Sequence, residues 1–397
     1  MIYLDNSATS PVDEEVYDAM LPYLREEYGN PSSKYYCKAT SARKAVEDAR
    51  EKVANLLGVS AGEIIFTAGA TESTNFIIKG FMDYRRYYGD GKNHIITSKV
   101  EHKATLNVCK YLNGDIYSNN DPTVTLFGGK QKVDRGYEAS FVDVTNAGEI
   151  TKDSIEAAIK DNTAMVSVIY VNNEVGTINN IEDIAGLCRE RDIALHVDLT
   201  QAVGKVKISL DQLGIGFASC SAHKIHGPKG VGAAVIKADA YGIQPITAFM
   251  HGGEQEQGFR AGTLAVHNIV GFGKAAEIAL RDFKKNTAYI HSIDEYAISR
   301  LLGIEGIRLT NPTSSRLPGI ISILVEKKDF NNERFIKKIS DEFALSTGSA
   351  CSAGEPSHVL AAMGLGNMTS NVLRISINKY TTKTDLDHIV AVLSQSI

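Results

Sequence analysis

Two short sequences in this chain combine residue types that can do covalent chemistry. Residues 346–354 (Ser-Thr-Gly-Ser-Ala-Cys-Ser-Ala-Gly) place Cys351 among small side chains that can bury almost no apolar surface. Residues 221–224 (Ser-Ala-His-Lys) place Lys224 26 residues after Asp198. A lysine can hold an aldehyde cofactor as a Schiff base, an aspartate can keep a pyridine nitrogen protonated, and a thiol can act as nucleophile. The combination predicts an enzyme whose chemistry involves sulfur.

Lys224 and Asp198 each have an ordinary alternative. A lone lysine is most often exposed on the surface, and an aspartate after a strand often caps the next helix. The surrounding sequence Ser-x-His-Lys-x-x-Gly-Pro-Lys-Gly favours a crowded cofactor pocket for Lys224. Asp198 ends an apolar strand and is followed closely by Gln201, which suits a pair with a pyridinium nitrogen.

A phosphate site is predicted where a strand turns into a helix. Residues 69–73 (Gly-Ala-Thr-Glu-Ser) follow a short apolar strand, and N–H groups at a helix N-terminus attract phosphate. Many such turns bind nothing, so the prediction depends on further donors. The residues that could form the phosphate cup are Ala70, Thr71, Ser221, His223 and Thr263.

Two more side chains are candidates for the site. His102 follows a strand and could stack on an aromatic cofactor ring or act as acid or base near neutral pH. An isolated histidine is more often structural. Arg374 stands inside an apolar strand, where an unpaired charge is costly. A substrate carboxylate would explain Arg374, and a buried salt bridge is the alternative.

The apolar pattern predicts the scaffold that must position these residues. Helices are expected at 42–57 and 181–191, and strands at 64–66, 94–97, 165–171, 193–198, 217–221 and 231–236. Such alternation indicates an α/β fold with a mostly parallel sheet covered on both faces. Ligands bind beyond the carboxyl ends of such strands. The candidates at those ends are Thr71, His102, Asn173, Asp198 and Lys224.

A smaller α/β unit is expected toward the C-terminus. Its predicted strands are 319–325 and 372–377, and its helices are 332–343 and 385–397, with a capping box between Thr382 and Asp385. We expect a large domain at 16–265 and a small domain of 1–15 and 266–397 that carries Cys351. Residues 113–140 are polar and weakly periodic, which predicts a surface excursion.

Composition excludes several other classes of protein. The chain has 397 residues, is 43% hydrophobic and carries a net charge of -5, which gives no electrostatic case for binding nucleic acid. Its 5 cysteines are odd in number and lack metal-ligand spacing, so neither a disulfide framework nor a metal site is predicted. An acidic N-terminal region and the lack of a long apolar run argue against a signal peptide and a membrane span. We expect a cytoplasmic protein.

Together the motifs resemble the cysteine desulfurase family, pyridoxal-phosphate enzymes of the class V aminotransferase superfamily. The resemblance implies a type I PLP-dependent transferase fold, with a seven-stranded sheet in the large domain, and a homodimer. The thiol loop resembles the branch that supplies iron–sulfur cluster assembly and tRNA thiolation. The matching segments run nearly end to end: 3–9, 29–33, 69–72, 101–103, 171–176, 196–198, 221–230, 260–263, 346–352 and 374–376.

The resemblance also implies roles and a reaction. Lys224 carries pyridoxal 5′-phosphate, Asp198 and Gln201 address its ring, and His102 stacks on it. Ala70, Thr71, Ser221 and His223 bind its phosphate, joined by Thr263 from the second subunit. Asn173 contacts cofactor and substrate, and Arg374 holds the substrate. L-cysteine becomes L-alanine, and Cys351 keeps the sulfur as a persulfide for an acceptor protein, a cluster scaffold or a tRNA-thiolation enzyme.

This chain departs from the family pattern at several points. Leu199 replaces an alanine after Asp198, Tyr36 replaces a histidine, and Ala39 replaces a glycine. The 113–140 excursion is longer than usual, and the chain stops at Ile397 without the tail that some members use to dock a scaffold.

Three alternatives to a cysteine desulfurase stay open. A selenocysteine lyase would share nearly all of these residues. Another class V enzyme, an aminotransferase or epimerase, would not need Cys351 on a loop of small residues. A non-enzymatic scaffold protein is disfavoured because Lys224, Asp198 and Cys351 are all present.

Overall fold

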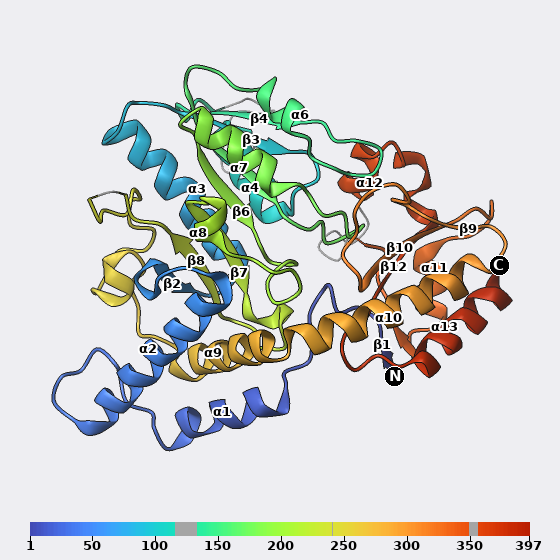
Figure 1. The fold of residues 1–397 in the computed structure, drawn as a ribbon, viewed down its shortest axis with the longest axis horizontal. Helices are drawn as coiled ribbons and strands as arrows, with labels where there is room; N and C mark the ends of the chain where they lie inside the picture. The colour runs from blue at the N-terminus through green and yellow to red at the C-terminus, as the bar shows by residue number, and fades with distance from the viewer. Residues whose placement is uncertain (116–132, 240, 349–355) are drawn as a thin grey trace.

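The computed structural model describes residues 1–115, 133–239, 241–348 and 356–397, and its largest element is a seven-stranded sheet (Figure 1). β8 is antiparallel to both of its neighbours, and the other strands pair in parallel. The mostly parallel sheet expected from the sequence is therefore confirmed. The strand order is β2 (Ile64–Thr67), β8 (Gly232–Ile236), β7 (Phe217–Ser221), β6 (Ala194–Asp198), β5 (Thr163–Ile169), β3 (His94–Ser98) and β4 (Glu138–Val142).

Helices cover both faces of this sheet, and its strands are therefore buried on both sides. Alternate residues of β8 divide between two apolar cores: Ala233 and Val235 belong to one, Ala234 and Ile236 to the other. The first core is completed by α2 (Cys37–Leu57), α7 (Ile181–Glu190) and α9 (Val266–Arg281). The second is completed by α3 (Ala70–Tyr87) and α4 (Lys103–Leu112).

A second, antiparallel sheet lies toward the C-terminus (Figure 1). Its order is β12 (Val372–Ser376), β10 (Ile320–Val325) and β9 (Ile307–Leu309), and it shares an apolar core with α10 (Phe283–Leu302), α11 (Asn332–Lys338) and α13 (Lys383–Ser396). α13 begins with the predicted capping box of Thr382 and Asp385.

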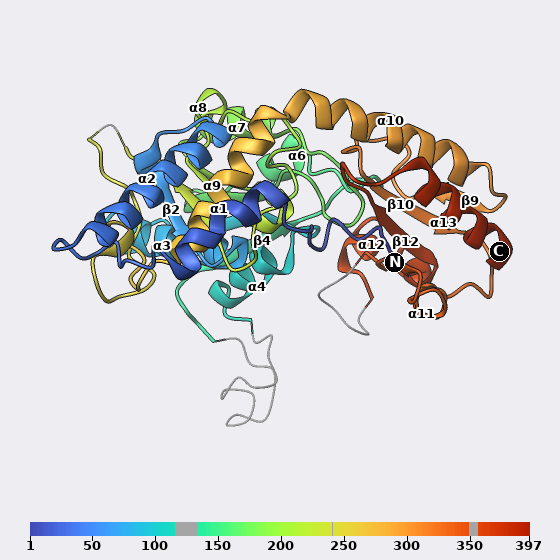
Figure 2. The same ribbon diagram turned by 90° about the horizontal axis from the view of Figure 1, so that it is seen from below.

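The long helices α9 and α10 follow one another along one side of the molecule (Figure 2). α9 packs on α1 (Glu14–Arg25) and α2, and α10 packs on α13. The sequence-based domain bounds of 16–265 for the large domain and of 1–15 and 266–397 for the small domain stay a prediction.

Three local expectations were wrong. The strand expected at 165–171 is β5, which spans Thr163–Ile169. The helix expected at 332–343 ends at Lys338, and Phe343–Ala344 instead forms β11, which pairs in parallel with β1 (Ile2–Tyr3). Two-residue strands are too short to leave an alternating pattern in the sequence. β4 (Glu138–Val142) begins inside the expected 113–140 excursion and extends beyond it; its residues are mostly half-buried, so they form no continuous apolar run. Residues 116–132 of that excursion lie outside the described residues.

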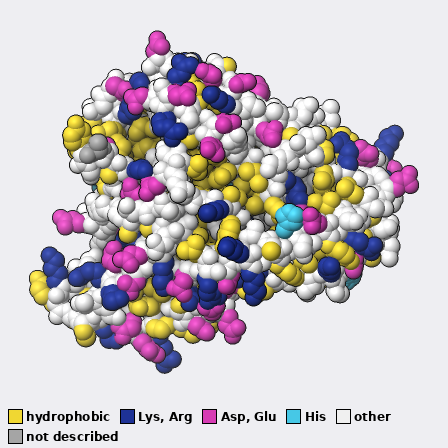
Figure 3. Space-filling model, viewed as in Figure 1, with side chains coloured by type: hydrophobic (Ala, Val, Ile, Leu, Met, Phe, Trp, Pro, Cys, Tyr) yellow, Lys and Arg dark blue, Asp and Glu magenta, His cyan; other side chains and the backbone are white. Residues whose placement is uncertain are grey.

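The distribution of charge on the surface and the composition of the helices can be compared with the expectations from the sequence. Figure 3 shows lysine and arginine interspersed with aspartate and glutamate over one face of the molecule. In the part of the chain that the structure describes, no helix is both long enough and apolar enough to cross a membrane.

Candidate active site

A cavity of about 760 Å³ lies at the carboxyl ends of the central parallel strands. Ile169, Asp198 and Ser221 are the last residues of β5, β6 and β7, and all three line it. This volume is typical of small-molecule sites. Ten of the predicted site residues lie on its walls: Ala70, Thr71, His102, Asn173, Asp198, Gln201, Ser221, His223, Lys224 and Arg374.

Lys224 lies on a short 3₁₀ turn, Ala222–Lys224, that directly follows β7. Its Nζ donates hydrogen bonds to Ser7 O at 2.5 Å and to Ala8 O at 2.8 Å. The N-terminal segment therefore forms one wall of the cavity and holds the amine through backbone carbonyls. No residue type in the sequence could have revealed these two contacts, because they use main-chain oxygens.

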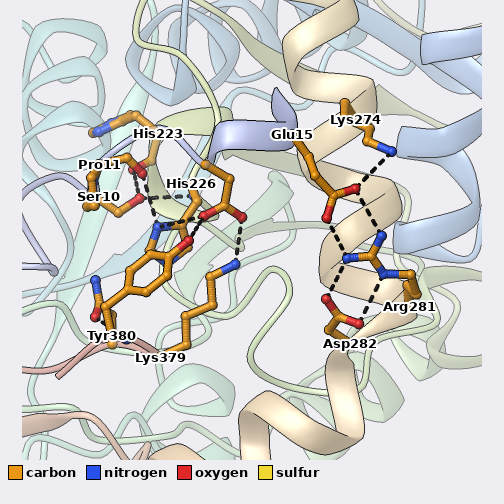
Figure 4. A network of polar contacts seen from close by, with 12 residues as sticks. Ser10, Pro11, Glu15, His223, His226, Lys274, Arg281, Asp282, Lys379 and Tyr380 are labelled. Atoms are coloured by element: carbon orange, nitrogen blue, oxygen red, sulfur yellow. Dashed lines mark hydrogen bonds and ion pairs between the residues drawn. The ribbon is translucent and has the colours of Figure 1, made fainter. Parts of the chain in front are cut away.

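A polar network ties the Lys224 turn to the segment that follows β12 (Figure 4). The N–H of His226 donates to Ser10 Oγ at 2.9 Å, and the N–H of Asp13 donates to His226 O at 3.0 Å. The Asp13 carboxylate accepts from Lys379 Nζ at 2.6 Å and from the Tyr380 hydroxyl. Because β12 also carries the candidate substrate residue, this network fixes the two halves of the site relative to one another.

Asp198, the last residue of β6, and His102, which precedes α4, both line the cavity. The Asp198 side chain is buried, and its Oδ1 accepts a hydrogen bond from Thr200 N at 2.8 Å. His102 is the N-cap of α4, and its Nδ1 accepts from Ala104 N at 3.1 Å. Burial lowers the pKa of His102, and the nearby Asp198 carboxylate opposes that shift. Since Nδ1 accepts a hydrogen bond, the ring proton of a neutral His102 lies on Nε2.

The N-terminus of α3 supplies a phosphate-binding geometry. Ala70 and Thr71 are its first two residues, so their N–H groups lack helical partners. Gly232 lets β8 approach this turn, because a Cβ there would lie 2.7 Å from Gly69 Cα. Glu72, whose charge would oppose an anion, is paired with Arg260 Nε at 2.8 Å. The turn can therefore accept negative charge.

Ser221 and His223 form another part of the cavity wall. Ser221 Oγ donates a long hydrogen bond of 3.4 Å to Val231 O. His223 Nδ1 lies 3.1 Å from Thr9 Oγ1, and burial together with Lys224 lowers the pKa of His223 to about 4. In the empty cavity His223 is therefore neutral near pH 7, and it can offer an anion a neutral N–H donor.

Arg374 is buried in β12 and reaches the cavity with several donors already in use. Nη1 donates to Asn173 O at 2.8 Å and to Gly348 O at 3.1 Å, and Nη2 pairs with Asp5 Oδ1 at 2.6 Å. Two of the five guanidinium N–H groups have no acceptor among the described residues: the one on Nε and one of the two on Nη2. The structure thus contains the salt bridge of the alternative interpretation together with donors for a carboxylate.

Two of the predicted site residues are not among the described residues that line this cavity. Thr263 is exposed and does not line this cavity. Cys351 lies outside the described residues. Leu199 is fully buried in the first apolar core and does not line the cavity either, so its difference from the family pattern changes packing beneath the sheet end. Ala39 is also fully buried, and the Tyr36 hydroxyl accepts a 3.3 Å hydrogen bond from Asn30 N.

Sequence reasoning missed several residues of the wall. Ser7, Ala8 and Glu174 line the cavity and belong to segments that carried the family resemblance, so those motifs were the available signal. His358 also lines it, seven residues after Cys351, and its Nε2 lies 2.9 Å from Glu101 O. No pattern around His358 distinguished it from an ordinary helix-start residue.

Comparison with known proteins places this geometry in a family. The family described as aminotransferase class-V matches residues 2–118 and 128–389. A protein of Aeromonas salmonicida named cysteine desulfurase IscS is 38% identical over an aligned length of 401 residues. The alignment covers 100% of this chain and 92% of that protein.

Solved structures give the same placement. A NifS-like protein has a TM-score of 0.85 and 33% identity, covering 100% of this chain and 98% of its own. A structure titled SspA in complex with cysteine has a TM-score of 0.78 and 31% identity, covering 96% and 100%. The chain belongs to the cysteine desulfurases of the class-V aminotransferase family.

Proposed function

We propose that this protein uses pyridoxal 5′-phosphate, the cofactor of its family, to convert L-cysteine to L-alanine and to transfer the sulfur to Cys351. The observation that carries the proposal is the convergence of Lys224, Asp198 and Arg374 on one cavity of about 760 Å³. A chain that aligns end to end with cysteine desulfurases supplies the reaction class.

The residues of the cavity fit this cofactor. Lys224 offers an amine for its aldehyde, the buried carboxylate of Asp198 offers a partner for its pyridine nitrogen, and the N-terminus of α3 offers N–H donors for its phosphate. When bound, pyridoxal phosphate supplies an electron sink for the bonds at the substrate Cα. With the cofactor and substrate bound, the Lys224 amine would take and return the proton at the substrate Cα.

Arg374 and Asn173 orient the substrate in this proposal. The two guanidinium N–H groups that lack acceptors among the described residues would donate to the substrate carboxylate. Asn173 accepts from Arg374 through its backbone oxygen, and both residues line the cavity. The buried position of Arg374 strengthens these hydrogen bonds because little water competes for them.

Cys351 takes up the sulfur of the substrate in this proposal. Its thiolate attacks the substrate Sγ, an S–S bond forms, and the substrate Cβ–Sγ bond breaks with its electron pair staying on the carbon fragment. Protonation of that fragment completes L-alanine, and the sulfur stays on Cys351 as a persulfide. We propose delivery from there to an acceptor protein, a cluster scaffold or a tRNA-thiolation enzyme.

Assembly is a separate part of the proposal. Thr263 is exposed outside the cavity, at the end of a segment anchored by the pair of Arg260 and Glu72. A two-fold dimer would let Thr263 complete the phosphate site of the partner subunit. Light scattering at micromolar concentration should then give twice the 43.0 kDa chain mass. A fully active monomer would remove Thr263 from the site. We also propose that the protein works in the cytoplasm.

Product analysis tests the proposed reaction. Protein loaded with pyridoxal phosphate should release alanine and sulfide in equal amounts from L-cysteine when a thiol reductant clears the persulfide. 3-Mercaptopyruvate or D-cysteine, formed without alanine or sulfide, would indicate another class V reaction. Turnover of selenocysteine alone would indicate a selenocysteine lyase. No turnover of either amino acid would overturn the proposal.

A further inference from the structure

The side-chain amide of Gln201 is held at both ends by groups that differ in kind. Its Nε2 donates to Ser7 O at 2.8 Å, and its Oε1 accepts from Lys205 Nζ at 3.1 Å. A backbone carbonyl only accepts and a lysine ammonium only donates, so with Lys205 charged the two contacts fix which end of the amide is nitrogen. Gln201 is also buried, which leaves no water to compensate a flipped amide.

This orientation matters because of where the nitrogen end lies. Ser7 O, the acceptor for Gln201 Nε2, also accepts from Lys224 Nζ at 2.5 Å. The amide N–H groups of Gln201 are therefore offered next to the amine that would hold the cofactor aldehyde. On a pyridoxal ring the phenolic oxygen is attached to the carbon beside the one that bears the aldehyde. A donor at that place stabilises the ionised phenolic oxygen, whereas the oxygen end of the amide would repel it.

Lys205 is an unusual residue for a merely structural contact. Burial lowers its pKa to about 7, and the neighbouring cations Lys224 and Arg374 add to that shift. The acceptor that the described residues give its Nζ is the neutral amide of Gln201. A buried amine among cations is costly, and a methionine would fill the same stem volume more cheaply. Both the charged and the neutral amine retain N–H groups that can donate to Gln201 Oε1, and only the neutral form also carries an acceptor lone pair.

We propose that Lys205 is a positioning residue that sets the orientation of the Gln201 amide and thereby lowers the pKa of the bound cofactor's phenolic oxygen. The proposal rests on the proposed function, since it concerns the same cofactor. Lys205 does not line the main cavity but a second one of about 70 Å³, whose wall also includes Ser7 and Lys224. It therefore acts from behind the site.

Titration of the bound cofactor tests this role without turnover. The loaded protein, free of substrate, is titrated while its visible spectrum is recorded, beside its melting temperature. In Lys205→Met the pH midpoint should rise by roughly one unit, the size expected for one lost hydrogen bond to a charged group. Lys205→Arg should keep the wild-type midpoint, because the guanidinium still donates and the adjoining cavity gives it room. Lys207→Met, at an exposed lysine two residues away, is the matched control and should titrate as wild type.

The outcomes separate the possible failures. A Lys205→Met protein that melts lower yet titrates as wild type would reduce Lys205 to a structural residue and overturn the proposal. If that variant does not fold, Gln201→Glu replaces it: Lys205 keeps an acceptor, but oxygen stands where Nε2 stood, so the midpoint should rise as well. An unchanged midpoint in Gln201→Glu also overturns the proposal. Wild-type protein that takes up no pyridoxal phosphate contradicts the proposed function instead.

Discussion

The guanidinium of Arg374 and the carboxylate of Asp5 form an ion pair of 2.6 Å across 369 residues of sequence. Asp5 comes from the N-terminal segment and Arg374 from β12, so the pair closes the cavity on the side of the small sheet. The Arg374 side chain is 1% exposed, whereas that of Asp5 is 19% exposed. The partly exposed carboxylate of Asp5 therefore neutralises the buried guanidinium of Arg374.

This arrangement gives opposite predictions for the two partners. Arg374→Lys should weaken apparent cysteine affinity by about 1.5–3 kcal/mol, because lysine cannot reproduce a two-pronged contact with a carboxylate. Asp5→Asn should lower the melting temperature but leave cysteine saturation unchanged or slightly tighter, because it frees Nη2. Saturation curves and melting temperatures measured on both variants check this. If Arg374→Lys changes only stability, Arg374 leaves the proposed substrate site.

The lysine that carries the cofactor is testable against a close neighbour. Lys224→Ala should lose covalent attachment of pyridoxal phosphate, which borohydride reduction followed by mass spectrometry detects directly. Lys229→Ala is the matched control, since Lys229 is exposed at the rim of the same cavity. The control should trap the cofactor as the wild type does. Trapping in Lys224→Ala but not in Lys229→Ala would reassign the attachment site.

The sequence was sufficient for the residues at strand ends. Asp198 and Ser221 follow apolar runs that can only be buried strands, and parallel strands bring their carboxyl ends together. Arg374 shows the limit of this reasoning. A charge in an apolar strand predicts a partner, but the sequence left a substrate carboxylate and a salt bridge as alternatives. The structure contains the salt bridge with Asp5 and leaves guanidinium N–H groups without an acceptor among the described residues.

Lys205 shows a second limit. It lies in the segment Lys205-Val206-Lys207, where nothing in the sequence distinguished it as part of the site. In the structure Lys205 is half-buried, contacts Gln201 and shares the wall of the small cavity with Ser7 and Lys224. The contacts of Lys224 with Ser7 and Ala8 use backbone oxygens, which carry no residue-type signal at all.

Sulfur transfer is separable from cofactor chemistry. Cys351→Ala should bind pyridoxal phosphate and show substrate-dependent spectral change, yet release almost no alanine or sulfide from cysteine. Cys37→Ala, at an exposed cysteine, should keep full activity. Sulfide and alanine assays on the two variants decide the matter. Wild-type turnover in Cys351→Ala would show that Cys351 does not accept the sulfur.

The carboxylate of Asp198 should matter for rate more than for assembly. Asp198→Ala removes the partner of the pyridine nitrogen, so the chemical step should slow by several orders of magnitude, whereas capture of sulfur by Cys351 should not change. Rapid-mixing spectroscopy of cysteine binding measures that step directly. Asp198→Glu serves as comparison, because it keeps the charge with altered reach. Equal rates in Asp198→Ala and wild type would contradict the assignment.

Glu101, next to His102, should make stability depend on pH. Burial raises the pKa of Glu101 to about 8, and the hydrogen bond that Ser98 Oγ donates to Oε1 at 2.6 Å only partly opposes this. The folded protein therefore holds a proton that the unfolded chain loses near its ordinary pKa of roughly 4.3. The stabilising contribution is full below that value and is lost as pH rises to about 8.

Substitution by an uncharged isostere should remove this dependence. Calorimetry should show the melting temperature of wild type falling between pH 5 and 8 more steeply than that of Glu101→Gln, by at most about 1.4 kcal/mol of unfolding free energy per pH unit. Glu305→Gln changes an exposed carboxylate and should follow the wild-type curve. Parallel curves for wild type and Glu101→Gln would mean that Glu101 is ionised in the folded protein. Its charge would then have to be balanced beside Asp198, which no cation among its described contacts does.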